Sequence, residues 1–309
     1  MGSPSSRERL GLLLGFIGMA IFGGTLPATR IAVAEIDPIA LTALRTAIAG
    51  LCSLALLLAL RRPLPPRALR PQLVIAMLCV AVLFPLLMSM GMRRVDASHG
   101  GVVLGVLPIA TALVAVAITH ERPRPLFWIA SVAGAALVIG FSLREGGGAF
   151  STGDLLLFAA VGVSAIGYAF SGRLASHMPG WEVISWILVI GLPLSIPAAA
   201  LTMPHDVGQI ALKPWLGLLY VALFSQWIGF FAWNAGLAMG GIARVSQVQL
   251  LQPFVTFVLA AYFNGETITL QILLFAVAVV VTVAISTRTR ATAAPSEPRR
   301  REPPQLAAS

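Results

Sequence analysis

Charged side chains are scarce in this chain. Of its 309 residues, 11% are charged and 58% are hydrophobic, and the mean hydropathy is +0.89. A soluble domain carries roughly 25% charged residues, so these few charges cannot cover a surface that faces water. The composition therefore excludes an ordinary soluble protein and predicts an integral membrane protein.

Cysteines and reactive clusters are scarce as well. The two cysteines, Cys52 and Cys79, both lie in apolar runs, which favours small buried side chains over a disulfide or a metal site. The sequence contains no paired carboxylates, metal-ligand cluster, phosphate loop or nucleophile elbow. We therefore expect no catalytic residue, no cofactor and no metal.

Long apolar runs are what the chain does contain. A membrane span needs about 20 apolar residues, and in lipid each span must be helical because an unpaired backbone group costs several kcal/mol there. The fold class we predict is all-α with ten transmembrane helices. The predicted spans are 10–33, 39–60, 72–92, 99–119, 126–143, 154–175, 182–201, 215–239, 243–263 and 267–286.

The basic residues predict the orientation of these spans. Counting the two ends and every second loop as one side gives fifteen Arg residues, whereas the other side has five Arg or Lys residues and Arg45 lies within a span. This bias places both termini in the cytoplasm, with residues 1–9 as a short N-terminal segment. The net charge of +9 therefore reflects topology and contact with anionic lipid rather than nucleic acid. Residues 287–309, rich in Pro, Arg and Ala, are expected to form a disordered basic tail.

The two halves of the chain resemble each other. An offset of 145 residues aligns four pairs of non-aliphatic residues. These pairs are Gly91 with Gly236, Pro108 with Pro253, Thr111 with Thr256, and Glu121 with Glu266. The alternative is coincidence, because helices rich in Leu, Ala and Val align easily.

A five-span repeat has a consequence for topology. Because five is odd, the second repeat must enter the membrane from the opposite side, so residues 10–143 and 154–286 are predicted to be inverted repeats. Secondary transporters commonly have this arrangement and alternate access around a site at the middle of the membrane.

Several short motifs resemble a known family. They are Asp37-Pro38 followed by Leu44-Arg45, Gly153-Asp154 at the start of the second half, and Pro253 followed by Gly265-Glu266-Thr267. In order and spacing they resemble the EamA branch of the drug/metabolite transporter superfamily over roughly residues 10–286. The resemblance implies a bacterial inner-membrane exporter of amino acids and related metabolites. The chain departs from the family where Ile21 and Phe22 precede Gly23, a place where relatives often carry Trp.

Two other classes of function stay as alternatives to a transporter of small molecules. One is a membrane-embedded enzyme, which the missing clusters of acids, histidines and metal ligands disfavour. The other is a non-transporting sensor or scaffold, which gives no reason for inverted repeats. The sequence carries no signal for an oligomeric state.

Buried acids are missing from the predicted spans. All twelve carboxylates fall in loops, tails or span ends, and His99 lies at the outer start of the fourth span. Proton-coupled carriers commonly use a buried Asp, Glu or His. We therefore expect no buried carboxylate, an interfacial His99, and flux without strict proton coupling.

Arg45 is the one cation predicted to lie inside a span. It follows Pro38 by seven residues, which places it about 10 Å along the helix. A charge at that depth is costly, so it needs a partner. We consider two interpretations: a contact with an anion or a carboxylate near the external mouth, or snorkelling or pairing with Glu35 or Asp37.

The eighth and ninth spans carry the polar and aromatic candidates. Helical spacing places Gln226, Phe230 and Trp233 on one face, flanked by Asn234. On the next span Gln249 and Pro253 share a face, with Gln252 beside it. Because amides in hydrocarbon are costly unless paired, these side chains line a substrate cavity or form hydrogen bonds between helices. Tyr168 and Trp186 are weaker candidates for the same cavity.

The repeat adds an asymmetry to this predicted cavity. The 145-residue offset pairs Trp233 with Met88, Gln249 with Leu104, and Gln252 with Leu107, and it pairs Gln226 with Ala81. One wall is thus predicted to be polar and the other apolar. Such a cavity suits a small zwitterion or amide with an apolar side chain.

Two further patterns concern backbone geometry. Pro108 and Pro253 occupy equivalent positions and are predicted to form matching kinks or hinges beside the cavity. Glycines spaced by four, such as Gly11 with Gly15 and Gly236 with Gly240, permit close contact between helices.

The charge bias makes a testable prediction about topology. Reporter fusions after Arg67 and Arg290 should report a cytoplasmic location, and a fusion after Gly147 should report a periplasmic one. A fusion after Arg290 that reports the periplasm would contradict both the cytoplasmic termini and the inversion of the repeats.

Overall fold

The computed structural model describes residues 6–119, 125–204, 206–240 and 246–289, and all the regular elements in this part of the chain are helices. Within it, seven helices are long and apolar enough to cross a membrane. They are Ser6–Ala32, Pro38–Ala59, Arg67–Met92, Pro125–Glu145, Thr152–Leu174, Gly180–Thr202 and Leu212–Leu237. Three shorter apolar helices, Ala97–Thr111, Val248–Asn264 and Leu270–Ser286, occupy the remaining predicted spans. The all-α prediction is confirmed for the described residues, and the count of ten spans stays a prediction.

The first half of the chain contains two interrupted helices. Its elements, in order, are α1 (Ser6–Gly23), α2 (Thr25–Ala32), α3 (Pro38–Ala59), the short η1 (Arg67–Leu69), α4 (Arg70–Ala76), the π-helical η2 (Met77–Leu83), α5 (Phe84–Met92), α6 (Ala97–Leu104), α7 (Leu107–Thr119) and α8 (Pro125–Glu145). The first predicted span is bent at Gly24, and the fourth is broken between Leu104 and Leu107.

The second half follows the same order. Its elements are α9 (Thr152–Leu174), α10 (Gly180–Thr202), η3 (Val207–Gln209), α11 (Leu212–Leu219), the π-helical η4 (Tyr220–Ile228), α12 (Gly229–Gly240), η5 (Ser246–Leu251), α14 (Gln252–Asn264) and α15 (Leu270–Thr289). The last helix begins at Leu270 and ends at Thr289, whereas the prediction was 267–286. Residues 290–309 of the predicted tail, residues 1–5, and Glu121 of the repeat alignment lie outside the described residues.

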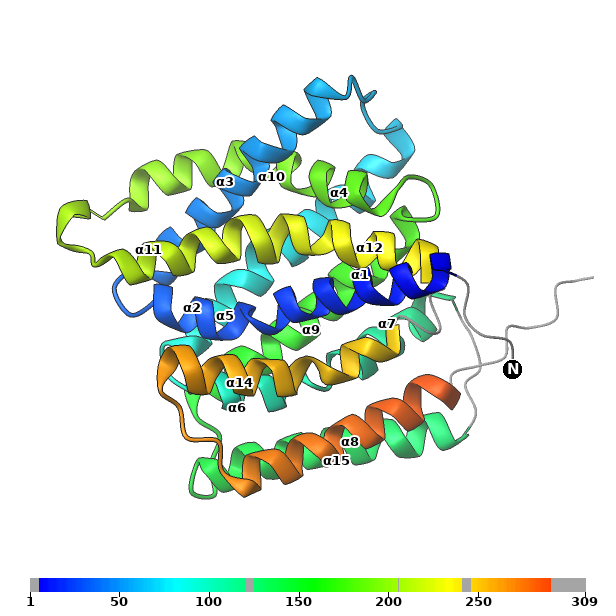
Figure 1. The fold of residues 1–309 in the computed structure, drawn as a ribbon, viewed down its shortest axis with the longest axis vertical. Coiled ribbons are helices and arrows are strands. Elements are labelled where there is room, and N and C mark those ends of the chain that lie inside the picture. Colours follow the sequence, from blue (N-terminus) through cyan, green and yellow to red (C-terminus); the bar gives the residue numbers. More distant parts are fainter. Residues whose placement is uncertain (1–5, 120–124, 205, 241–245, 290–309) are drawn as a thin grey trace, which may run out of the picture.

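The helices run alternately in opposite directions along the bundle. In Figure 1, α1 begins at the right, near the N-terminus, and α15 ends at the same side. The first helix of the second half, α9, runs from left to right, opposite to α1. This is the antiparallel relation that an odd number of spans in each half requires.

The contacts between helices reflect the repeat: a contact between two helices recurs when each helix is replaced by its counterpart in the other half. The α1 helix packs on α12, and its counterpart α9 packs on α5, which is the counterpart of α12. Three further pairs join a predicted span to the equivalent span of the other half. These pairs are α3 with α10, α6 with α14, and α8 with α15. The core therefore lies between the halves rather than within either one.

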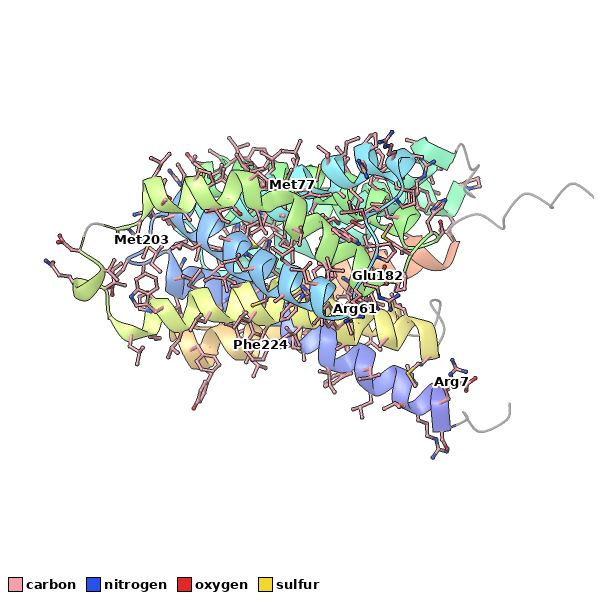
Figure 2. All side chains as sticks on the ribbon, turned by 90° about the horizontal axis from the view of Figure 1, so that it is seen from above. Arg7, Arg61, Met77, Glu182, Met203 and Phe224 are labelled. Atoms are coloured by element: carbon pink, nitrogen blue, oxygen red, sulfur yellow. The ribbon has the colours of Figure 1, made fainter. Side chains whose placement is uncertain are left out.

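The outside of the bundle is apolar. Large side chains such as Leu58, Val132 and Phe224 are exposed, and sticks project from every helix around the bundle (Figure 2). In the same view Arg7, Arg61 and Glu182 lie toward one end of the bundle and Met203 toward the other. An apolar belt with polar ends is the surface that a lipid bilayer covers.

Glycines allow the α1–α12 pair to approach closely. A Cβ atom at Gly236 would lie 2.5 Å from the backbone nitrogen of Gly15 and 2.9 Å from the carbonyl oxygen of Gly11. Its repeat counterpart, Gly91 on α5, faces Leu157 of α9 at 3.0 Å. The predicted close contact through Gly11, Gly15 and Gly236 is confirmed.

Two π-helical segments occupy equivalent places in the halves. Met77 and Tyr220, which begin them, are 143 residues apart, within two residues of the repeat offset. π-Helical turns are rare and are frequently found at functional sites. The sequence analysis identified neither of them.

The paired prolines lie at helix starts rather than inside continuous helices. Pro108 is the second residue of α7, after the break that follows α6, and Pro253 is the second residue of α14, after the tighter helix η5. A first-turn position costs no hydrogen bond, because the N–H that Pro lacks would have no helical partner there. The predicted mid-helix kinks are therefore helix breaks, and their role as hinges stays a prediction.

The close glycine contact makes a prediction about stability. Gly236→Val places side-chain atoms against the backbone of α1, which cannot move aside locally, so it should destabilise the protein by about 1–3 kcal/mol or more. Gly140→Val on α8 is the matched control, because no atom lies within 4 Å of a Cβ built there. Thermal unfolding in detergent should show a lower midpoint for Gly236→Val alone. Equal midpoints would contradict the close approach of α1 and α12.

Candidate functional site

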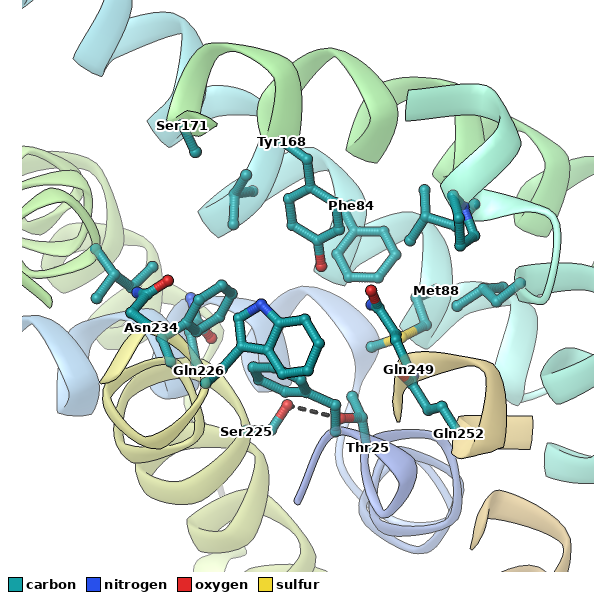
Figure 3. Close-up of a pocket in the computed structure, with 18 of the residues that line it drawn as sticks. Thr25, Phe84, Met88, Tyr168, Ser171, Ser225, Gln226, Asn234, Gln249 and Gln252 are labelled. Carbon is teal, nitrogen blue, oxygen red and sulfur yellow. Dashed lines mark hydrogen bonds between the residues drawn. The ribbon is translucent and has the colours of Figure 1, made fainter. Parts of the chain in front are cut away.

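A cavity of about 450 Å³ lies between the two halves (Figure 3). Pockets of about 300–1,000 Å³ are the usual size for small-molecule sites. Apart from Trp186, which is buried on α10 and does not line the cavity, the lining contains every residue that the sequence analysis proposed for a substrate cavity. These residues are Arg45, Met88, Tyr168, Gln226, Phe230, Trp233, Asn234, Gln249 and Gln252, together with Pro108 and Pro253. That they bind substrate stays a prediction.

A chain of hydrogen bonds crosses one wall of the cavity. Arg45 Nε on α3 donates to Gln226 Oε1 on η4 at 2.5 Å, and Gln226 Nε2 donates to Thr46 Oγ1 at 3.3 Å. Thr46 Oγ1 donates in turn to the carbonyl oxygen of Ala81 at 2.8 Å. Because Pro85 has no N–H, it cannot donate to the Ala81 carbonyl four residues earlier. The Thr46 hydroxyl therefore satisfies a carbonyl that the proline frees.

Arg45 is buried in this wall with part of its guanidinium unpaired. Its residue exposure is 3%, and its Nη1 atom finds no hydrogen-bond partner among the described residues. The two acids considered as its partners make other contacts. Glu35 accepts from the backbone N–H of Ala211 at 2.8 Å, and Asp37 caps α3 through Ile39 N and approaches Arg93. The interpretation that Arg45 pairs with either acid or snorkels to the surface is wrong.

Aromatic rings form a second part of the lining. Phe22 on α1 packs edge-on against Phe230 at 4.9 Å and against Trp233 at 6.4 Å between ring centroids. Asn234 lies against Gly180 at the start of α10, where an added Cβ would be 2.6 Å from the amide group. Phe22 thus occupies the cavity wall, a role that the sequence analysis did not propose for it.

The walls differ in polarity as the repeat offset predicts. Leu104 and Leu107 of the first half line the cavity, and so do their counterparts Gln249 and Gln252 of the second. Figure 3 shows Tyr168, Phe84, Met88 and Gln249 directed into the same space. Both types of wall therefore face the same space.

Several polar lining residues have no signal in the sequence analysis. Thr25 and Ser225 share a hydrogen bond of 2.7 Å that joins α2 to η4 at the edge of the cavity (Figure 3). Ser171 lines the cavity from α9. Isolated Ser and Thr residues are common in membrane helices, so their position in the sequence does not separate them from others of their kind.

The cavity reaches the end of the bundle where α1 begins. Gly172 and Ala175, at the C-terminal end of α9, both line the cavity and are exposed. Gly180 at the start of α10 and Leu237 near the end of α12 also line it. The opening therefore lies at the end of the bundle where α1 begins and α15 ends.

A polar cluster closes the opposite end. Glu266 accepts hydrogen bonds from the backbone N–H groups of Ala97 and Ser98, each at 2.8 Å, and its Oε1 lies 3.4 Å from Arg30 Nε. Arg30 also pairs with Asp96 at 2.5 Å and donates to the backbone carbonyl of Val95. The cluster joins α14 of the second half to α2 and α6 of the first.

The local sequence after α14 explains how Glu266 reaches α6. Gly265 ends the helix with φ of +70°, a left-handed conformation that glycine adopts without strain. The backbone N–H of Glu266 then donates a hydrogen bond to the Ala260 carbonyl at 3.3 Å. A carboxylate at the N-terminus of α6 also meets the positive end of that helix.

One acid is buried near this closed end, contrary to expectation. Asp154, third residue of α9, has 1% exposure, and its Oδ1 lies 2.7 Å from Nε2 of the buried His99. Its Oδ2 accepts hydrogen bonds from the backbone N–H and hydroxyl of Ser151, which forms a capping box at the start of α9. Asp154 lies at a span end, as predicted, but the prediction of no buried carboxylate and of an interfacial His99 is wrong. The expectation of flux without proton coupling therefore loses its basis.

Metal-binding side chains do not gather elsewhere in the part of the chain that the structure describes. No three His, Cys, Asp or Glu side chains are grouped there as a metal site requires. Cys52 and Cys79 are both free thiols.

Comparison with known proteins identifies relatives. The sequence model of the EamA-like transporter family matches residues 9–143 and again residues 151–288. An uncharacterized transporter, YdeK, of Bacillus subtilis (strain 168) is 44% identical over 258 residues, which cover 84% of this chain and 90% of that protein. A second uncharacterized transporter of the same organism, YyaM, is 23% identical over 57% of this chain and 60% of its own length.

One solved structure shares the fold. It is described only as the crystal structure of a protein, with a TM-score of 0.62 and 21% sequence identity. The match covers 90% of this chain and 96% of that chain.

The closed end makes a prediction about access to the cavity. Glu266→Gln removes the charge that pairs with Arg30. It also leaves one side-chain oxygen where two now accept backbone N–H groups, so the closed arrangement should lose about 1–3 kcal/mol of stability. Leu104→Cys, in a background with both native cysteines replaced by Ala, should then react at least fivefold faster with an impermeant thiol reagent added at that end. Asp206→Asn, an exposed acid in the loop between α10 and α11, should leave the rate unchanged. Equal rates with Glu266→Gln and its parent would contradict the closure.

Proposed function

The chain belongs to the EamA-like transporter family, and we propose that it is a secondary transporter that exports small organic metabolites, amino acids or related amphipathic compounds, from the bacterial cytoplasm. It is a multi-pass membrane protein, and we place it in the inner membrane with both termini in the cytoplasm. Relatives that are named as transporters favour this function over a membrane-embedded enzyme or a scaffold.

The observation that carries the proposal is the central cavity and its opening toward the end of the bundle where α1 begins. The cavity lies between the halves, reaches exposed residues of α9 at that end, and is separated from the other side by the Arg30–Asp96–Glu266 cluster. A carrier needs such a site that opens to one side at a time. With cytoplasmic termini, this arrangement is the inward-open state, ready to take substrate from the cytoplasm.

Inverted repeats would supply the second state. The pair α1–α12 is equivalent by the repeat to the pair α9–α5, and the two π-helical segments occupy equivalent places in the halves. In our proposal, the outward-open state arises when the contacts of the two halves exchange roles. The broken helices α6–α7 and η5–α14 provide the positions at which that motion bends, beside Pro108 and Pro253.

The difference in polarity between the walls supports an amphipathic substrate. Gln249 and Gln252 offer amide groups, whereas Leu104, Leu107 and Met88 offer apolar contact. A sugar needs polar contacts on all sides, which this cavity lacks. A compound with one polar end and an apolar body meets both walls.

Counterflow in proteoliposomes tests this function. Liposomes that contain the purified protein and a high internal concentration of an unlabelled candidate should accumulate the labelled compound transiently, since an alternating carrier exchanges one for the other. A channel gives no such overshoot, so the assay separates the two mechanisms. If no amino acid or related amphipathic metabolite in the panel gives an overshoot above protein-free liposomes, the proposal is wrong.

Gln249→Leu should weaken this transport while the protein still folds. The substitution reproduces the first-half residue Leu104 and removes a hydrogen bond to the polar end of the substrate, worth on the order of 1 kcal/mol or about fivefold in affinity. The measurement is the concentration for half-maximal counterflow. Gln209→Leu, the same substitution at the exposed end of η3, should leave it unchanged. An unaltered half-maximal concentration for Gln249→Leu would argue against a role of this amide in binding.

A further inference from the structure

The charge inside the cavity is uncompensated. Among the described residues that line it, Arg45 alone is charged. Its hydrogen-bond partner Gln226 is neutral, and so is Thr46, which accepts from Gln226. A buried cation without a counter-ion is costly in a low dielectric, and proteins normally pair it. Here the partner has to come from outside the described protein residues.

The guanidinium is positioned to receive such a partner. Its Nε is held by Gln226 at 2.5 Å, which in turn is held by Thr46, so the plane of the group is oriented by the protein. Its Nη1 is buried without a partner although Arg45 lines the cavity. A guanidinium presents its donors in a fork that matches the two oxygens of a carboxylate.

From this geometry we propose that Arg45 is the receptor for the carboxylate of the substrate, and that the preferred substrates are organic monocarboxylates with an apolar body. The inference rests on the proposed transport function and narrows its substrate class. The carboxylate lies at Arg45, and the apolar body extends along Phe84, Met88 and Trp233.

Charge balance favours monocarboxylates over dianions, zwitterions and amines as substrates. A monoanion and Arg45 form a neutral pair, the least costly combination in a site surrounded by lipid. A dianion such as a phosphate monoester leaves one negative charge unpaired. An α-amino acid zwitterion leaves its ammonium group without an acid, since the described lining contains no Asp or Glu. The order of preference is therefore monocarboxylate, then zwitterion or amide, then amine.

Binding of matched probes to the purified full-length protein tests the proposal. The probes share one body and differ at one end: 3-phenylpropanoate, 3-phenylpropanamide, 3-phenylpropylamine and phenylalanine, with a parallel series built on butanoate. Titration calorimetry should show that each carboxylate binds at least tenfold more tightly than its amide, and the amine most weakly. Equal affinity of carboxylate and amide, or no binding by either carboxylate, would overturn the proposal.

Variants distinguish the effect of Arg45 on carboxylate binding from the effect of the protein's overall positive charge. Arg45→Gln should abolish the preference of carboxylate over amide, and Arg45→Lys should retain part of it, because the ammonium keeps the charge but loses the fork. Arg144→Gln, an exposed position at the end of α8, makes the same change of net charge and should keep the full preference. A preference that persists in Arg45→Gln would overturn the assignment.

The same probes distinguish this inference from the transport function. Counterflow of the amides or amines equal to that of the carboxylates would leave the transporter proposal intact and overturn the substrate class. Carboxylate-selective binding without counterflow of any probe would support Arg45 as receptor and contradict transport.

Discussion

In hydrocarbon, a polar group without a partner costs several kcal/mol, and every break in the helices of this protein has to meet that requirement. The bend at Gly24 leaves backbone carbonyls of α1 outside regular helix. The hydroxyl groups of Thr256 and Tyr220, both from the second half, donate to the carbonyls of Gly23 and Ile21 at 2.8 Å. The second half therefore supplies hydrogen bonds that the irregular backbone of the first half needs.

The same requirement explains why the cavity is central. The π-helical segments, the broken helices and the polar side chains are all costly against lipid, and all gather where the halves meet. The outer helices, such as the α8–α15 pair, are more regular and expose apolar side chains. Irregular backbone lines a cavity, whereas regular helix faces the membrane, as the cost of unsatisfied groups demands.

Charge is distributed by the same logic at the closed end and in the middle of the bundle. Glu266, Arg30 and Asp96 satisfy one another and the first N–H groups of α6, and Asp154 is satisfied by Ser151 and His99. Arg45 differs, because its Nη1 has no partner within the described residues. A site that is incomplete without a ligand is what a binding protein has to present, and the cavity offers one such charge.

The sequence by itself determined the helical class, the approximate spans, the offset between the halves and the candidate lining of the cavity. These follow from local rules: the cost of an unpaired backbone in lipid produces long apolar helices, and helical spacing puts Gln226, Phe230 and Trp233 on one face. The difference in polarity between Leu104 and Gln249 could also be predicted, because the repeat relates these two positions and both line one cavity.

Only the tertiary structure decided how the polar groups pair. Arg45 bonds to Gln226, 181 residues away, and not to the nearby Glu35 or Asp37. Asp154 begins a helix, yet it is buried because His99, 55 residues earlier, packs over it. The π-helical segments also escaped prediction, since their backbone geometry depends on partners such as Thr46 on another helix. Burial and pairing arise between segments distant in the chain, and no local pattern of residues encodes which of them meet.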